Sequence, residues 1–152
     1  MKTLLITYHT QTGNTKQLVD AARRGANAID SPITVNCKPT HDVSVTEMQQ
    51  SDGYIFATPE NFGYMSGELK ALFDRTYYDA REQTAGKSYA LLISCDNDGQ
   101  GAVKAIQRIL LGYNMKDSQL CHIAKNPQAQ TDLDAAYDIG LYFAEALSLG
   151  AI

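Results

Sequence analysis

The sequence predicts an α/β fold, in which five parallel strands form one sheet with helices on both faces. Five short apolar runs are separated by stretches in which apolar residues recur every three or four positions. This alternation is typical of strands that are buried on both faces by crossover helices. A chain of 152 residues is long enough for one such sheet and its core. We therefore expect a single domain over residues 1–152.

The first strand is expected at residues 3–8, and a helix with one apolar face follows it. A second strand, at 33–37, leads to Ser44 and Glu47, whose spacing is that of a capping box. A short helix is expected to begin there and to end before Gly53. The apolar face of the first helix consists of Leu18, Ala22, Ala26 and Ile29.

The third and fourth strands are expected at residues 53–58 and 89–95. The third strand precedes a helix that begins near Ser66, and the fourth precedes a helix whose apolar positions run from 103 to 113. Both strands are short apolar runs next to stretches of helical period, as expected for a parallel sheet covered by helices.

The last strand, at 119–123, precedes a helix for which Thr131 is the expected N-cap. Because connections between parallel strands are short and right-handed, two arrangements remain, the strand order 2-1-3-4-5 and the dinucleotide-binding order. Five strands favour the first. Its ligands bind beyond the carboxyl ends of strands 1 and 3, where the winding direction reverses. We expect the loops at those ends to carry the function.

Composition argues against several function classes. The formal net charge is -4 and Lys and Arg are not clustered, which argues against a nucleic-acid partner. Cys37, Cys95 and Cys121 are widely spaced, so neither a disulfide framework nor a metal site is indicated. No run approaches the roughly 20 apolar residues of a membrane span, and the N-terminus lacks a signal-peptide core. We expect a cytoplasmic protein without a membrane partner.

The first loop, between the first strand and its helix, is rich in hydroxyl groups. A helix that begins there points its unpaired N–H groups and the positive end of its dipole into the loop, and both favour an anion. Gly13 allows a close approach of the backbone. The same residue types are also common in turns and caps, so the loop alone leaves both interpretations open. Its residues are Thr10, Gln11, Thr12, Gly13, Asn14 and Thr15.

The second loop follows the third strand and carries two aromatic rings. Phe62 and Tyr64 flank Gly63, and Pro59 stiffens the exit from the strand. Such a loop is suited to wall a flat heteroaromatic ring and to offer main-chain N–H groups to its edge. The alternative is that both rings only pack at the rim. The residues expected to contact a ligand are Thr58, Pro59, Glu60, Asn61, Phe62 and Gly63.

Two strings in these loops resemble known families. The pattern TxTGNT after a first strand resembles the phosphate-binding loop of flavodoxins, which holds the ribityl phosphate of FMN. The string ATPENFGYMSGELKALFDR is similar to the TPxxFGxMSGxxKxFxD region of NAD(P)H:quinone reductases and NADPH-dependent FMN reductases. The chain therefore resembles the flavodoxin-like superfamily over almost its whole length. The insertions of long-chain flavodoxins and of quinone reductases are missing.

The resemblance implies a flavodoxin-like three-layer sandwich that binds FMN non-covalently as its cofactor. It places the phosphate at loop 10–15, the ribityl chain and the N5 side of the ring at 58–63, and the pyrimidine side at the third loop. Main-chain contacts dominate in that third loop of the family, so residue type is loosely constrained. The third loop consists of Cys95, Asp96, Asn97, Asp98 and Gly99.

Two functions follow from the resemblance. One is an NAD(P)H-dependent oxidoreductase that reduces a quinone, a flavin or a similar small molecule. The other is a flavodoxin-type carrier of single electrons between protein partners. Dedicated carriers are strongly acidic, and a net charge of -4 is modest, which favours the reductase. Hydride transfer needs no side-chain acid or base, so we assign no catalytic residue and no metal ligand. The resemblance also allows a homo-oligomer in which a neighbouring chain covers the flavin.

Overall fold

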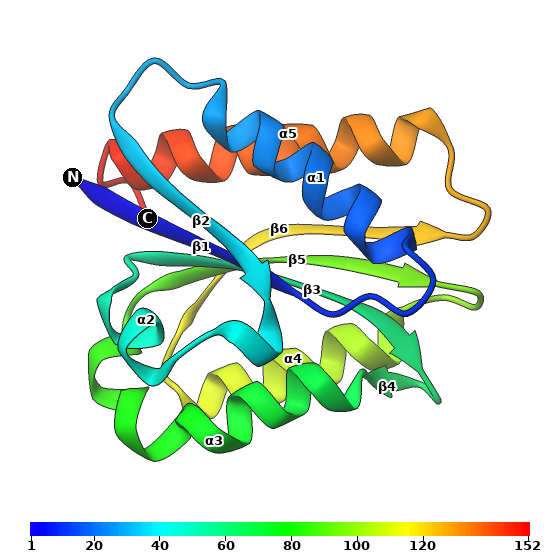
Figure 1. Cartoon of the computed structure of the whole chain (residues 1–152), viewed down its shortest axis with the longest axis horizontal. Coiled ribbons are helices and arrows are strands. Elements are labelled where there is room, and N and C mark those ends of the chain that lie inside the picture. The colour runs from blue at the N-terminus through cyan, green and yellow to red at the C-terminus, as the bar shows by residue number, and fades with distance from the viewer.

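The computed structural model describes residues 1–152, which form a twisted sheet between two layers of helices (Figure 1). Its strands are β1 (Lys2–Tyr8), β2 (Ile33–Pro39), β3 (Gly53–Asn61), β4 (Tyr64–Met65), β5 (Ser88–Cys95) and β6 (Lys116–Lys125). The five long strands are parallel and lie in the order β2-β1-β3-β5-β6. Counted without the short β4, this is the predicted order 2-1-3-4-5, which is confirmed.

Five helices cover the sheet, with α1 and α5 on one face and α2, α3 and α4 on the other (Figure 1). They are α1 (Asn14–Asn27), α2 (Val45–Gln50), α3 (Gly67–Thr84), α4 (Gln100–Gly112) and α5 (Gln130–Ser148), with a 3-10 turn η1 (Thr40–Asp42) before α2. The capping box at α2 is confirmed, because Ser44 and Glu47 each bind the main-chain N–H of the other. Ser66 is the N-cap of α3, as its position predicts.

Several boundaries differ from the prediction. β6 spans Lys116–Lys125 rather than 119–123, and β2 ends at Pro39 rather than at residue 37. α1 ends at Asn27, before Ile29, which still packs against the apolar cluster beside the helix. α5 begins at Gln130, so Thr131 lies in its first turn and the predicted N-cap is wrong. The start of α5 is instead stabilised by Asp132, whose carboxylate accepts the Ala129 N–H at 2.9 Å. A carboxylate inside the first turn thus replaces the expected hydroxyl.

A further difference lies at the end of β3. The sequence predicts that this strand ends at residue 58 and opens into a loop, whereas β3 continues to Asn61 and returns as β4. Glu60 pairs with Met65 and Asn61 with Tyr64, in antiparallel register. A short hairpin therefore projects beyond the edge of the parallel sheet.

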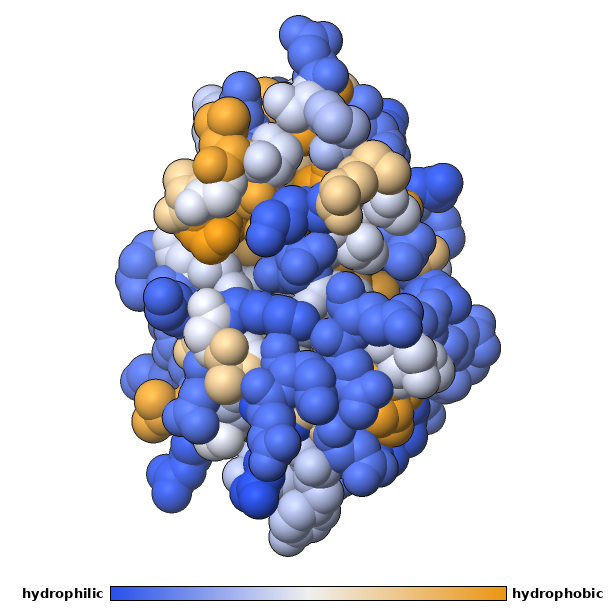
Figure 2. Space-filling model, turned by 90° about the vertical axis from the view of Figure 1, so that its left-hand side faces the viewer, coloured by the Kyte–Doolittle hydropathy of each residue, from blue (hydrophilic) through white to orange (hydrophobic).

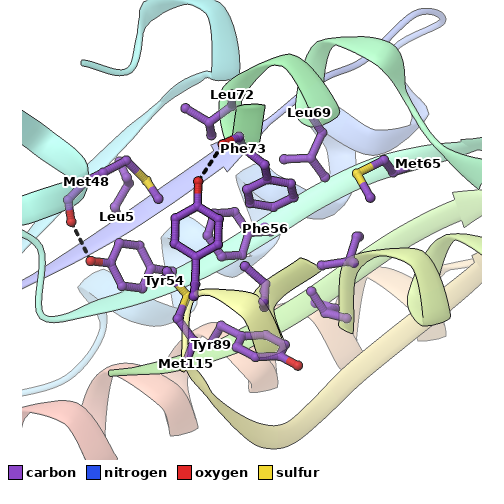
Figure 3. Close-up of a cluster of buried hydrophobic side chains, with 14 of the residues drawn as sticks. Leu5, Met48, Tyr54, Phe56, Met65, Leu69, Leu72, Phe73, Tyr89 and Met115 are labelled. Atoms are coloured by element: carbon purple, nitrogen blue, oxygen red, sulfur yellow. Dashed lines mark hydrogen bonds between the residues drawn. The ribbon is translucent and has the colours of Figure 1, made fainter. Parts of the chain in front are cut away.

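The sheet is buried on both faces, and each face carries its own apolar cluster. Leu4 and Ile6 of β1 pack toward α1 and α5, while Leu5 packs toward the opposite helices. This explains why the central strands are continuous apolar runs rather than alternating ones. In the cluster on the face of α2, α3 and α4, Tyr54 and Phe56 lie with parallel rings whose centroids are 5.7 Å apart. Figure 3 shows both rings in this cluster, with Leu72 and Phe73 of α3 above them.

The helices α1 and α5 approach each other at the level of their backbones. A Cβ atom on Gly25 would collide with the Tyr137 carbonyl, and one on Gly140 would collide with the Ala22 carbonyl. Both positions therefore require glycine for steric reasons. The contact holds α1 against α5, and both helices begin at the right-hand end in Figure 1.

Both chain termini lie at the opposite end of the molecule (Figure 1). Figure 2 shows this end, whose surface is mainly hydrophilic, with hydrophobic residues gathered toward the layer of α1 and α5. None of the helices combines the length and the apolar character that crossing a membrane requires.

Candidate functional site

The carboxyl ends of β1, β3 and β5 meet at the right-hand end in Figure 1, where α1 begins. A cavity of about 110 Å³ lies among the loops at these ends. It brings together three segments that are far apart in the sequence, as the predicted topology requires. The predicted site residues that line it are Gln11, Thr12, Asn14, Thr15, Pro59, Glu60, Asn61, Cys95 and Asp96. The remaining ones, outside its lining, are Thr10, Gly13, Thr58, Phe62, Gly63, Asn97, Asp98 and Gly99.

The first loop is shaped to leave the start of α1 open. Gly13 is the residue before the helix and has a left-handed backbone, with φ of 94°. Its N–H donates to the hydroxyl oxygen of Thr10 at 3.0 Å, which closes the loop. No side chain caps α1, and its first turn contains no acidic residue. The first N–H groups of the helix are therefore available to an anion.

A buried hydroxyl pair joins this loop to β5. The hydroxyl oxygens of Thr15 and Ser94 are 2.7 Å apart, and both side chains are buried. Ser94 also lines the cavity. It was not predicted as a site residue, although a serine at the end of an apolar strand was a signal that pointed to this edge of the sheet.

The second loop is a tight hairpin turn between β3 and β4. Phe62 and Gly63 have φ of 54° and 69°, and this pair of positive values at the two central residues is that of a type I′ turn. For Phe62 this conformation costs about 1–2 kcal/mol. Its ring nevertheless lies fully exposed, so it does not pack at the rim as the alternative interpretation proposed. The Thr58 hydroxyl is used within the hairpin, where it accepts the Ser66 N–H at 3.0 Å.

Glu60 holds this hairpin to the start of α4. Its carboxylate accepts the N–H groups of Gly99, Gly101 and Ala102 at 3.3, 3.1 and 3.4 Å. Carboxylates are favoured at helix N-termini because they neutralise the unpaired N–H groups and the dipole. Glu60 thus lines the cavity, as predicted, but its charge is engaged by the protein itself.

The third loop forms the turn between β5 and α4. Asp98 accepts the Gln100 N–H at 3.0 Å at the start of α4. The Cys95 thiol is buried beside Glu60 and Asp96, and burial first and these carboxylates next raise its pKa. The thiol therefore stays protonated near neutral pH, which is the behaviour of a structural cysteine.

A fourth segment, between β6 and α5, reaches the cavity and was not predicted. Asn126 lines the cavity, donates its main-chain N–H to the Cys95 carbonyl at 2.8 Å, and donates its side-chain N–H to Asp96 at 3.1 Å. The carboxyl end of β6 lies at the same edge of the sheet as those of β1, β3 and β5. The topology could therefore have indicated this loop, although its residue types carry no recognisable pattern.

Several buried polar atoms near these loops have no hydrogen-bond partner. They include Nδ1 of His9, the side-chain oxygen of Asn126 and both amide atoms of Gln128. A buried polar group without a partner costs about 1–3 kcal/mol, so partners from outside the chain are expected at this end of the molecule.

These features fit FMN. The open start of α1 and the hydroxyls beside it suit a phosphate group, and the amide and hydroxyl groups of the cavity suit a hydroxyl-bearing chain. The exposed Phe62 and the main chain of the hairpin suit a flat ring. A larger hollow of about 650 Å³ between α4 and β6 is open and largely apolar, and none of the strand-end loops lines it. The smaller cavity is therefore the candidate site.

The sequence matches the model of the family described as NADPH-dependent FMN reductase over residues 36–121. It is 28% identical over 110 residues to a flavodoxin of Aquifex aeolicus, which covers 72% of this chain and 59% of that protein. It is 27% identical over 95 residues to an NAD(P)H dehydrogenase (quinone) of Acidithiobacillus ferrooxidans, covering 50% of this chain and 48% of that protein. The chain thus spans about half of the length of these relatives.

Solved structures share the fold. A flavodoxin from the domain Archaea superposes with a TM-score of 0.82 at 20% identity, covering 95% of this chain and 98% of that one. A flavodoxin, WrbA-like protein from Agrobacterium tumefaciens superposes with a TM-score of 0.77 at 17% identity, covering 97% and 98%. These comparisons confirm the flavodoxin-like fold.

Proposed function

Since the chain belongs to the NADPH-dependent FMN reductase family and its cofactor is FMN, we propose that it is an NAD(P)H-dependent oxidoreductase. Its acceptor would be a quinone, a free flavin or a similar small molecule. The main support for the proposal is the match to the NADPH-dependent FMN reductase family. The matched residues, 36–121, include the whole hairpin of β3 and β4, which is proposed to hold the ring. The proposal treats residues 1–152 as one FMN-binding domain.

The phosphate of FMN would lie at the start of α1, held by N–H groups and by the hydroxyls of loop 10–15. The cavity has several times the roughly 30 Å³ of a water molecule, so it has room for the polar end of a ligand but not for a ring system. The ring would lie outside it, between the hairpin at 58–63 and the loop at 95–99. Bound FMN supplies the redox chemistry, since its ring accepts a hydride and passes electrons on.

The residues of the chain position the ring and set its surroundings. Glu60 fixes the hairpin against α4, so that the main chain at Gly63 stays in one place. Asp96 and Asp98 are exposed beside the proposed ring position and disfavour additional negative charge there. The loop at 95–99 contains no aromatic side chain that could stack on the flavin ring. The face of the ring on the side of this loop would therefore stay open to a nicotinamide or an acceptor.

The proposal is tested by steady-state assays of the FMN-loaded protein with NADH or NADPH and benzoquinone. We expect turnover clearly above that of the same concentration of free FMN. Turnover equal to that of free FMN with both nucleotides would contradict the reductase. We also propose a homo-oligomer in which a neighbouring chain covers the flavin, and size-exclusion chromatography with light scattering of the same sample tests it.

A flavodoxin-type carrier is the second candidate, and the similarity to the flavodoxin of Aquifex aeolicus supports it. A carrier would show no turnover with either nucleotide, and a potentiometric titration would resolve two well-separated one-electron steps. A reductase is expected to show steps that overlap. A protein that fails to quench the fluorescence of added FMN would contradict both candidates.

A further inference from the structure

The hollow between α4 and β6 is separate from the flavin site and has the size of a ligand site. Its volume is about 650 Å³, within the roughly 300–1,000 Å³ of small-molecule sites. Tyr89 and Asp117, which line it, lie near the amino ends of β5 and β6, away from the strand-end loops. Tyr89 and Met115 form a buried apolar floor, and Figure 3 shows them beside each other at the edge of the buried cluster.

One stripe of α4 forms a wall of this hollow. Lys104, Arg108 and Leu111 line it and are spaced by four and three residues, so they share one face of the helix. The Leu111 side chain is 74% exposed. The helix thus presents two cations and an uncovered apolar side chain beside an apolar floor.

The two cations of the stripe have no partner in the chain. The ion pairs of the other lysines lie on β1, α1, β2 and α3, and neither Lys104 nor Arg108 donates a side-chain hydrogen bond. Like charges four residues apart destabilise a helix. An anion between them would remove this repulsion, so the wall favours a negatively charged ligand.

Asp117 brings one carboxylate to the β6 side of the hollow, and the protein itself satisfies it. Its oxygens accept the side-chain N–H of Gln107 at 3.0 Å and the main-chain N–H of Gln119 at 2.8 Å. Two cations and one carboxylate leave the hollow with a net positive charge of one. A ligand with a single negative charge complements it, and a carboxylate also suits the planar fork of an arginine.

The edge of β6 beside the hollow is not suited to pair with another strand. Between Asp117 and Cys121, residues 118–120 face Ala90 alone, so the strand bulges there. Gln119 has φ of 67°, and Lys116 is exposed. Bulges and lysines at a sheet edge oppose the addition of a strand. We therefore expect a small molecule in the hollow and not a strand of a second chain.

We propose that the hollow between α4 and β6 is a second binding site, which takes an apolar molecule with one carboxylate, such as a fatty acid. The carboxylate would lie against Lys104 and Arg108, and the apolar body would cover Leu111 and Met115. The hollow contains none of the residues proposed to bind FMN, so this proposal does not depend on the proposed reductase.

The test is an NMR titration of the FMN-loaded protein with octanoate, 1-octanol and octylammonium, which share an apolar body and differ in charge. Main-chain amide signals of residues 104–117 report the hollow, and those of residues 10–15 report the flavin site. We expect octanoate to shift only the first set and to bind about tenfold more tightly than 1-octanol. Octylammonium should bind more weakly than 1-octanol. The FMN-free protein should give the same dissociation constants.

Two variants separate the roles of charge and apolar surface. Lys104→Gln combined with Arg108→Gln should lower the affinity for octanoate to that for 1-octanol, without changing the latter. Arg23→Gln combined with Arg24→Gln removes two exposed cations from α1 and is the matched control. Leu111→Ser should weaken both ligands, and the exposed position of this side chain leaves the core intact.

Four results would overturn the proposal. Equal affinities of the wild type for octanoate and 1-octanol would show that the cations select no anion. Octanoate that shifts residues 10–15 instead would bind at the flavin site, and octanoate that shifts neither set would leave the hollow without a ligand of this class. A dimer in light scattering that Leu111→Ser dissociates would assign the hollow to a second copy of the chain.

Discussion

The carboxylate of Glu60, at the end of β3, accepts the main-chain N–H of Gly101, in the first turn of α4, at 3.1 Å. The two residues are 41 positions apart in the sequence. Because Gly101 has no side chain, the Gly63 carbonyl also lies directly against it. The hairpin and the start of α4 are thereby held as one unit, and the two loops proposed to flank the flavin ring keep a fixed spacing.

Replacing Glu60 by alanine is expected to lower the free energy of unfolding by about 1–2 kcal/mol, because the N–H groups at the start of α4 lose their acceptor. FMN affinity should fall while inorganic phosphate affinity stays unchanged, since the start of α1 is untouched. Urea unfolding and ligand titration measure these effects. Glu68→Ala, an exposed change in the first turn of α3, serves as the control. Unchanged FMN affinity would show that the hairpin keeps its place without this cap.

Gly13→Val is expected to abolish tight FMN binding. Valine resists the left-handed backbone of this position, and its side chain would stand where the phosphate approaches. Losing two charge-assisted hydrogen bonds corresponds to at least about a 100-fold rise in the dissociation constant. Gly86→Val carries similar strain, with φ of 80° and open space around it, but lies in the turn before β5. Equal FMN losses in both variants would mean that strain, and not the phosphate site, causes the effect.

Phe62→Asn is expected to stabilise the protein by up to about 1 kcal/mol, because asparagine accepts the left-handed conformation of a type I′ turn. The reductase should nevertheless lose efficiency with benzoquinone, since an exposed aromatic ring beside the flavin is lost. Thermal unfolding and kcat/KM measure the two effects. Tyr78→Asn removes another exposed ring from α3 and should leave kcat/KM unchanged. A Phe62→Asn protein with full activity would show that the ring has no role in the reaction.

Asp132→Asn is expected to destabilise the protein at pH 7 by about 0.5–2 kcal/mol. The Ala129 N–H first, and His122 at 2.8 Å next, lower the pKa of the Asp132 carboxyl. A carboxyl whose pKa is lowered by folding stabilises the protein above its unfolded pKa of about 3.9, and this contribution disappears as the pH falls through the lower folded pKa. Urea unfolding should therefore show wild type and variant converging below about pH 4.

The control for this prediction is Asp134→Asn, an exposed change in the same turn of α5. It should alter stability little at either pH. If the difference between Asp132→Asn and wild type persisted at pH 3, the carboxylate charge would not be its source.

The strand positions and the helix faces could be predicted because they depend on hydrophobic periodicity, which is local in the sequence. The strand order could be predicted because connections between parallel strands are short and right-handed, which leaves few arrangements. Leu4, Leu5 and Ile6 show by their unbroken run that β1 is buried on both sides. The capping box of Ser44 and Glu47 is equally local, since its partners are three residues apart. The start of the first loop was predictable for the same reason, because Gly13 and its hydroxyl neighbours directly follow a strand.

The features that were missed depend on contacts between distant segments. The hairpin extends β3 because Glu60 finds its partners at residues 99–102, and no local pattern shows that pairing. Asn126 reaches the cavity only through the parallel register of β6 beside β5. Asp132 replaced Thr131 at the start of α5 because one carboxylate meets both Ala129 and His122, a choice that the sequence leaves undecided.

The close contact of α1 with α5 through Gly25 and Gly140 has a consequence for how the ligand is held. One helical layer carries the proposed phosphate anchor, and its partner helix follows the loop of Asn126. The opposite layer carries the hairpin and α4, which would hold the ring. The tail and the head of the cofactor would therefore depend on two different helical layers, which are linked at this end by the sheet and by the hydrogen bonds of Asn126 to Cys95 and Asp96. Weakening the contacts between the hairpin and α4 would allow the ring to move outward while the phosphate stays bound at the start of α1.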